Sequence, residues 1–228
     1  MQNVESRPVK AGRFFVARVC ASLAPMNEHI AHSFLSEPAT TQAAEGMPRR
    51  AFTVAEIEAM VEAGIIAENE RFELIGGEVV PMSPKGARHE NVKIELNRHF
   101  QRILPDDLSM GPETTLRLDA KTFVEPDFCV FPRSIQPGDM RGHDVLLAVE
   151  VADTSLAYDT GRKIGIYAAW GIPEVWVIDA RTLVTHVHRR LGTEGYAAVF
   201  QVAPDGEVVS VRAPALTLCL SRLGLKPV

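Results

Sequence analysis

The sequence has few cysteines and no long apolar run. Its 228 residues include three cysteines, Cys20, Cys129 and Cys219. This odd count, without zinc-ribbon spacing, argues against a disulfide framework. No stretch approaches the roughly 20 consecutive apolar residues that a membrane-spanning helix needs. We therefore expect a protein of a reducing cytoplasm with no membrane partner.

Positive charge is also scarce. Lys and Arg number 24 against 29 Asp and Glu, which gives a net charge of −5. This balance excludes a uniformly basic nucleic-acid binder of the histone kind. An enzyme that holds DNA in a local basic groove beside acidic metal ligands stays possible. Hydrophobic residues make up 46% and charged residues 23%, which is typical of a globular protein.

The first 46 residues lack the periodic apolar pattern of the rest of the chain. Arg18 interrupts the one apolar segment that could serve as a secretory signal. We interpret residues 1–46 as a poorly ordered extension and residues 47–228 as one domain. A start codon assigned too early, with Met26 or Met47 as the true start, is an alternative, and a cleaved signal is another.

Local patterns predict both helices and strands in residues 47–228. Thr53 followed by Glu56 is a capping-box pattern, which predicts a helix that stops near Gly64. Two β-prone runs separated by Gly76 and Gly77 predict a hairpin, because glycine accepts positive φ at both turn positions.

The remaining elements follow from apolar periodicity. We predict helices at 89–104 and 156–170, and strands at 114–118, 127–131, 145–151, 175–178, 182–188, 196–201 and 208–211. Because strands and helices mix without strict alternation, the fold class is α/β (α+β), with a mixed central sheet flanked by helices.

Two acidic residues lie within apolar strand sequences, and a lysine follows them. Asp127 opens the run Phe128–Phe131, and Glu150 interrupts an otherwise apolar run. A buried carboxylate costs several kcal/mol unless a cation compensates it. Lys163, on the helix that follows, is one candidate cation.

Metal binding explains why these two carboxylates and this lysine occur together. Two carboxylates at strand ends suit Mg²⁺, which prefers oxygen ligands and keeps several waters. The ion can polarise a phosphoryl oxygen and lower the pKa of water, and a lysine can hold that water or neutralise developing charge. The pattern is therefore suited to phosphodiester hydrolysis.

The chain resembles the Uma2 family of endonucleases, of the PD-(D/E)xK restriction-endonuclease-like superfamily, over residues 50 to 220. The motifs that carry the resemblance are, in order, Phe72-Glu73-Leu74-Ile75, Gly77-Glu78, Met82-Ser83-Pro84, His89, Pro126-Asp127, Glu150-Val151, Lys163, Tyr167, Gly171-Ile172-Pro173-Glu174-Val175-Trp176 and Asp179. Their order and spacing together are specific, although each motif alone is weak.

The resemblance implies a nuclease site that depends on Mg²⁺ or Mn²⁺ and acts on DNA. Asp127 and Glu150 match the two acidic residues of the superfamily motif and are the expected metal ligands. Ala152 stands where the superfamily has lysine, which nominates Lys163 in its place. Glu73 and His89 are the further candidates for the catalytic site, and analogy with the superfamily implies a homodimer.

Each candidate also has a plain structural interpretation. Asp127 could be a turn residue, Glu150 half of a structural ion pair, and Lys163 a solvated helix residue. Glu73 could lie on an exposed strand face, and His89 could cap a helix or lie at the surface.

Other patterns are weaker. His186 and His188, two apart on one strand, could bind zinc, but a solvated hairpin face is the simpler interpretation. The segment 83–86 lacks the full glycine pattern of a phosphate loop.

Three functions follow from these residues. The first is a DNA endonuclease in which the basic residues Lys93, Arg88, Arg98 and Arg162 contact phosphates. The second is a non-catalytic DNA-binding or assembly module that retains the nuclease scaffold, for which Ala152 and the acidic charge leave room. The third, a glycoside hydrolase with two carboxylates, leaves the lysine without a role and ranks last.

Overall fold

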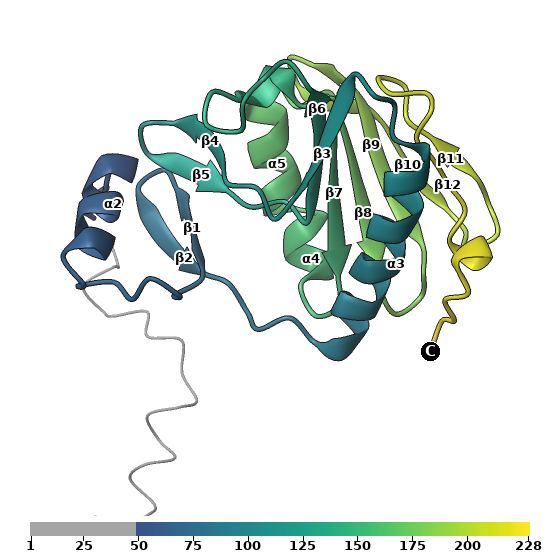
Figure 1. Cartoon of the computed structure of the whole chain (residues 1–228), viewed down its shortest axis with the longest axis horizontal. Coiled ribbons are helices and arrows are strands. Elements are labelled where there is room, and N and C mark those ends of the chain that lie inside the picture. The colour runs from purple at the N-terminus through teal and green to yellow at the C-terminus, as the bar shows by residue number, and fades with distance from the viewer. Residues whose placement is uncertain (1–48) are drawn as a thin grey trace, which may run out of the picture. The chain divides into compact units, whose positions relative to one another are not determined.

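Helices cover both faces of a mixed β-sheet in the computed structural model, which describes residues 49–228 (Figure 1). Residues Arg50–Val228 form one unit by their internal contacts. The expected extension at 1–46, with its alternative start sites, lies outside the described residues. Among residues 49–228, no helix is long and apolar enough to cross a membrane.

The elements follow each other along the chain as helices, short 3₁₀ turns and strands. The helices are α2 (Val54–Glu62), α3 (Ala87–Ile103), α4 (Leu156–Asp159) and α5 (Arg162–Ala169), and the 3₁₀ turns are η3 (Gly142–Asp144) and η4 (Leu220–Leu223). The strands are β1 (Phe72–Ile75), β2 (Glu78–Pro81), β3 (Leu108–Pro112), β4 (Leu116–Asp119), β5 (Thr122–Val124), β6 (Phe128–Pro132), β7 (Leu147–Ala152), β8 (Glu174–Asp179), β9 (Thr185–Gly192), β10 (Gly195–Val202), β11 (Val208–Val209) and β12 (Thr217–Leu218).

The central sheet has six strands in the order β10-β9-β8-β7-β6-β3. Only β7 and β8 run parallel, and α4 and α5 form the crossover between them. All other neighbours in this sheet are antiparallel. The fold is therefore the predicted mixed α/β arrangement.

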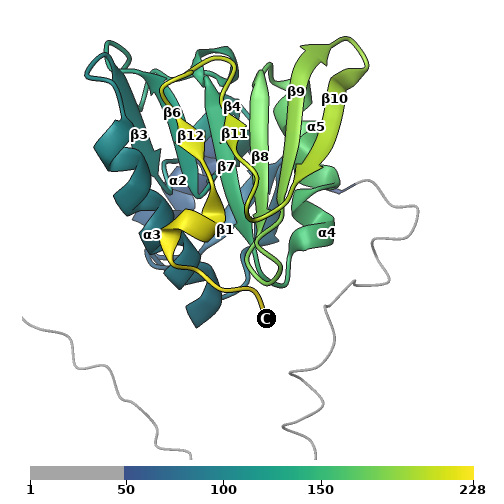
Figure 2. The ribbon, with the colours of Figure 1, turned by 90° about the vertical axis from the view of Figure 1, so that its right-hand side faces the viewer.

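Side chains of β7 alternate between two apolar cores, one on each face of the sheet. Val149 and Val151 pack in the core that includes the buried side of α3. Ala148 and Ala152 face the other core, with Tyr167 of α5. Figure 2 shows α3, η4, β11 and β12 on one side of the sheet and α4 and α5 on the other. This alternation places Glu150 on the α5 side.

A second sheet, in the order β2-β1-β5-β4, carries α2 beside it. The predicted capping box is present, since Thr53 and Glu56 bond reciprocally at the start of α2. The predicted hairpin is also present, with φ of +60° at Gly76 and +86° at Gly77. This sheet carries Glu73 on β1, with Glu125 just beyond the end of β5.

The structure corrects several predictions of single elements. The helix expected at 156–170 breaks into α4 and α5 at Gly161, where φ is −112° and ψ is −96°. A Cβ at Gly161 would lie 2.8 Å from the carbonyl oxygen of Ala157, so this break needs glycine. The sequence patterns also missed β3, β5 and β12, which are short and bounded by turn residues.

Candidate active site

A cavity of about 410 Å³ opens at the end of β7. The segment after β2, the first turns of α3 and the helices α4 and α5 surround it. Its acidic lining residues are Glu73, Glu125, Asp127, Glu150, Asp153 and Asp159, and its lysines are Lys85 and Lys163. Because carboxylates outnumber ammonium groups, the cavity favours a cation.

Asp127 and Glu150 face the same side of the sheet. Strands β6 and β7 are antiparallel, with Phe128 opposite Val149. Extending this register by one residue places Asp127 opposite Glu150, and directly opposite residues project to the same face. The two carboxylates therefore do not point to opposite faces of the sheet.

The two carboxylate oxygens of Asp127 have different partners. Oδ2 accepts the Val151 backbone N–H at 2.8 Å and lies 3.1 Å from His89 Nε2. Within residues 49–228, Oδ1 accepts a hydrogen bond only from the Lys85 ammonium, at 2.7 Å. Burial alone would raise the pKa of Asp127, but His89 and Lys85 outweigh it and hold the pKa below its ordinary value.

Glu150 is buried beside a cation and a phenol. Oε1 lies 2.9 Å from Lys163 Nζ and accepts the Tyr167 hydroxyl. Oε2 accepts no hydrogen bond from residues 49–228. Burial raises the pKa of Glu150 to about 8, because the nearby Lys163 ammonium offsets only part of the desolvation.

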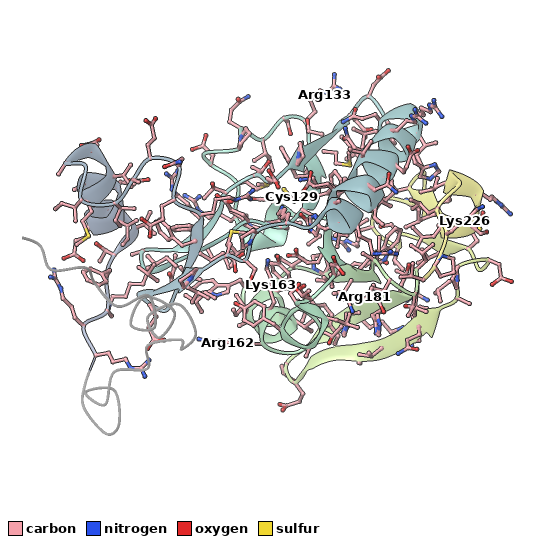
Figure 3. The ribbon with its side chains drawn as sticks, turned by 90° about the horizontal axis from the view of Figure 1, so that it is seen from below. Cys129, Arg133, Arg162, Lys163, Arg181 and Lys226 are labelled. Carbon is pink, nitrogen blue, oxygen red and sulfur yellow. The ribbon has the colours of Figure 1, made fainter. Side chains whose placement is uncertain are left out.

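Lys163 joins the two sheets at this site. Its Nζ lies 3.0 Å from Glu73 Oε1 as well as 2.9 Å from Glu150 Oε1. Burial would lower the pKa of Lys163, but the two carboxylates outweigh it and raise the pKa above its ordinary value. In Figure 3, Lys163 lies among the packed side chains between the sheets, whereas its neighbour Arg162 extends outward.

All five predicted site residues lie at this cavity. Glu73, His89 and Lys163 are 3%, 6% and 4% exposed. The interpretations that placed Glu73 on an exposed face, His89 at the surface and Lys163 in solvent are therefore wrong. His89 does not cap α3 either, because Gly86 is the N-cap residue.

The sequence analysis missed a second lysine–carboxylate bridge. Lys85 Nζ contacts both Asp127 and Glu113, and Lys93 Nζ lies 2.8 Å from the same Glu113 oxygen. Burial would raise the pKa of Glu113, but the two lysines lower it to about 2. Glu113 has φ of +48°, an unusual backbone conformation for a residue other than glycine. No sequence pattern indicated Glu113. Lys85 lies in the segment 83–86, which lacks the glycine pattern of a phosphate loop and was therefore not predicted to belong to the site.

Two further residues of the cavity also escaped the sequence analysis. Asp159 accepts the Ser155 hydroxyl at 2.5 Å, and burial raises its pKa. The Tyr158 hydroxyl is buried and has no hydrogen-bond partner in the described part of the chain. Burial, followed by the charge of Glu73, raises the pKa of Tyr158. An orphaned hydroxyl at an acidic cavity indicates a polar ligand or water there.

The donor set fits a magnesium ion that keeps several waters. Within residues 49–228, no three His, Cys, Asp or Glu side chains converge closely enough to hold a metal by themselves. Mg²⁺ is often held by only one or two carboxylates plus waters and substrate phosphate. Asp127 Oδ1 and Glu150 Oε2 are the two oxygens that could bind the metal. The other oxygen of Asp127, Oδ2, already accepts from the Val151 N–H and contacts His89. The other oxygen of Glu150, Oε1, contacts Lys163 and Tyr167.

The expected phosphate contacts divide into two groups. Arg98 and Arg162 are exposed, and Arg88 is half-buried. Lys93 instead forms ion pairs with Glu90 and Glu113 and belongs to the site's charge network.

The histidine pair on β9 has a different outcome. His186 and His188 join no metal-binding group among the described residues. His188 is only 6% exposed, so a solvated hairpin face is wrong for this residue.

Comparisons with known proteins agree with the architecture. Residues 54–221 match the family described as Uma2, putative restriction endonuclease. A crystal structure of a "putative nuclease belonging to DUF820" from Anabaena variabilis superposes with a TM-score of 0.57 at 15% identity. The match covers 75% of this chain and 97% of that one, and it shows a shared fold. A search of curated proteins found no match.

Proposed function

The chain belongs to the Uma2 family of putative restriction endonucleases, and we propose that it is a metal-dependent DNA endonuclease. Asp127 and Glu150 bind Mg²⁺ or Mn²⁺ in this proposal, and Lys163 assists the attacking water. The observation that supports it best is the pair of carboxylates on neighbouring strands, each with one oxygen free of rigid partners, beside the same cavity.

The reaction is hydrolysis of a phosphodiester bond. Water adds to phosphorus, one P–O bond to a deoxyribose oxygen breaks, and the water proton ends on the leaving oxygen. Mg²⁺, when bound, polarises a phosphoryl oxygen and lowers the pKa of water. The chain's residues position the reactants, and His89 and the Val151 N–H fix the orientation of Asp127.

Lys163 can also hold a reactant. Its ammonium group has three N–H donors and forms ion pairs with Glu150 and Glu73. A donor turned to the cavity can hold water or a phosphate oxygen, which is the role that lysine has in the superfamily motif. Lys163 thus compensates for Ala152.

DNA would bind across the cavity mouth. The cavity is acidic, so the strand's phosphates need basic contacts outside it. Arg162 is exposed and Arg88 is half-buried. Each is the sequence neighbour of a residue that lines the cavity, Lys163 and His89 respectively. They are the proposed phosphate contacts nearest the reacting group.

Cleavage assays on matched variants test this proposal. We expect purified wild-type protein to cleave DNA with Mg²⁺, and Asp127→Asn and Glu150→Gln to lose about 10²-fold or more. Asp106→Asn, an exposed carboxylate away from the cavity, is the control and should cleave as wild type does. Activity that persists in folded Asp127→Asn would show that a contaminant cleaves the DNA.

The alternative function is a non-catalytic DNA-binding or assembly module. The pairing of both carboxylates with lysines supports it, because such pairs can also be purely structural. DNA binding that survives chelation, together with no cleavage of duplex, single-stranded or branched DNA, would favour this function.

A further inference from the structure

Access to Asp127 is controlled by one flexible side chain. Its Oδ2 is held by a backbone N–H of β7 and by the buried imidazole of His89. Its Oδ1 has the Lys85 ammonium as its partner, at 2.7 Å. Any cation that reaches Asp127 from the cavity must therefore bind at Oδ1 and compete with Lys85.

Lys85 differs from Lys163 in how firmly it is held. Lys163 lies on α5, and its side chain is 5% exposed and lies between the strand residues Glu73 and Glu150. Lys85 lies in the irregular segment before α3, and its side chain is 15% exposed at the cavity. Its second partner, Glu113, is 31% exposed. Four rotatable bonds allow such a lysine to move its charge by several ångströms.

We propose that Lys85 is a displaceable internal cation, which occupies Asp127 Oδ1 without metal and moves to a substrate phosphate oxygen when a divalent ion takes that position. This inference rests on the proposed function for the phosphate step. Its first step, competition between Lys85 and a divalent ion for Asp127, concerns metal binding alone.

Charge repulsion drives the exchange. A divalent ion at Oδ1 would lie within a few ångströms of the ammonium, and like charges this close repel each other even in water. Glu113 stays within reach of Lys85 and also binds Lys93. Lys85 therefore remains tethered near the cavity mouth after it leaves Asp127, where a phosphate would approach.

The test uses Lys85→Met with Lys93→Met as its matched control. Both variants remove an ammonium that contacts Glu113, but only Lys85 contacts Asp127. The probe is Mg²⁺ alone, titrated without DNA and read from the rise in melting temperature. We expect Lys85→Met to bind Mg²⁺ about tenfold more tightly than Lys93→Met does, since the competing cation is gone. DNA cleavage by Lys85→Met at saturating Mg²⁺ should fall by about tenfold or more.

The outcomes separate this inference from the proposed function. Mg²⁺ affinity in Lys85→Met that equals or falls below that of Lys93→Met overturns the exchange. Tighter Mg²⁺ binding with unchanged cleavage overturns the phosphate role. Tighter Mg²⁺ binding with no cleavage by wild type supports the exchange and rejects the nuclease. Lys85→Gln, which keeps a polar side chain, serves for the same titration if Lys85→Met does not fold.

Discussion

Replacing Glu150 by glutamine should make the stability of the protein less dependent on pH. The pKa of Glu150 rises from 4.5 to about 8 on folding. A raised carboxyl pKa means that the folded state favours the protonated form. The stability from this group is therefore complete below pH 4.5 and is lost as pH rises through 8. Glutamine keeps the shape of the protonated acid and does not titrate.

The expected magnitude follows from the two pKa values. Each pKa unit is worth about 1.4 kcal/mol. The unfolding free energy of wild type should therefore fall by about 1–3 kcal/mol from pH 6 to pH 9 because of Glu150. Lys163 does not disturb this comparison. Its folded pKa lies above the ordinary 10.5, so its own contribution is lost only above pH 10.5. It also keeps Glu73 as a partner in the variant.

Urea unfolding at pH 6, 7.5 and 9, with a chelator present, measures the effect. Glu174→Gln is the control, since Glu174 is equally buried but accepts hydrogen bonds from Trp176 Nε1, Ser210 Oγ and Val211 N. We expect this variant to lose about 1–3 kcal/mol at every pH, because buried donors lose their acceptor. If Glu150→Gln is destabilised as much as Glu174→Gln at pH 9, Glu150 is a structural ion-pair residue and the reasoning is refuted.

Three further predictions address the cavity and its surroundings. Tyr158→Phe should leave the urea midpoint unchanged or slightly raised, because the hydroxyl has no hydrogen-bond partner within residues 49–228. Its cleavage should fall about tenfold, and cleavage at the wild-type rate would show that the hydroxyl takes no part. Arg162→Ala should weaken DNA binding and reduce the slope of log affinity against log salt by about 1, measured by fluorescence anisotropy, and an unchanged slope would exclude a phosphate contact. Gly77→Ala should lower the melting temperature markedly, because φ is +86° and a Cβ would lie 2.6 Å from Ala51 Cβ, and an unchanged value would contradict this packing.

The fold was largely predictable from local signals. The capping box at Thr53 and the Gly76–Gly77 turn specify their elements through contacts a few residues apart, and both are present. The break at Gly161 was not predicted, although the polar run Asp159–Lys163 interrupts the apolar pattern there and contains a glycine, a poor helix former. Its cause is a backbone conformation that only the folded chain reveals.

The site was predictable where burial made a residue conspicuous. A carboxylate inside an apolar strand marks Glu150 without further information, and family resemblance nominates Asp127 and Lys163. Glu113 and Lys85 carry no such signal, because each lies in a polar segment where charged residues are ordinary. Lys85 contacts Glu113 and Asp127 only because the fold brings together residues that lie 28 and 42 positions apart in the sequence.

Anomalous diffraction from crystals of the protein soaked in millimolar Mn²⁺ shows whether Asp127 and Glu150 share a metal ion. We expect one anomalous peak within about 2.2 Å of both Asp127 Oδ1 and Glu150 Oε2, with Lys85 withdrawn from Asp127. The absence of a peak there, with Lys85 still bound to Asp127 and Lys163 to Glu150, would refute the metal site.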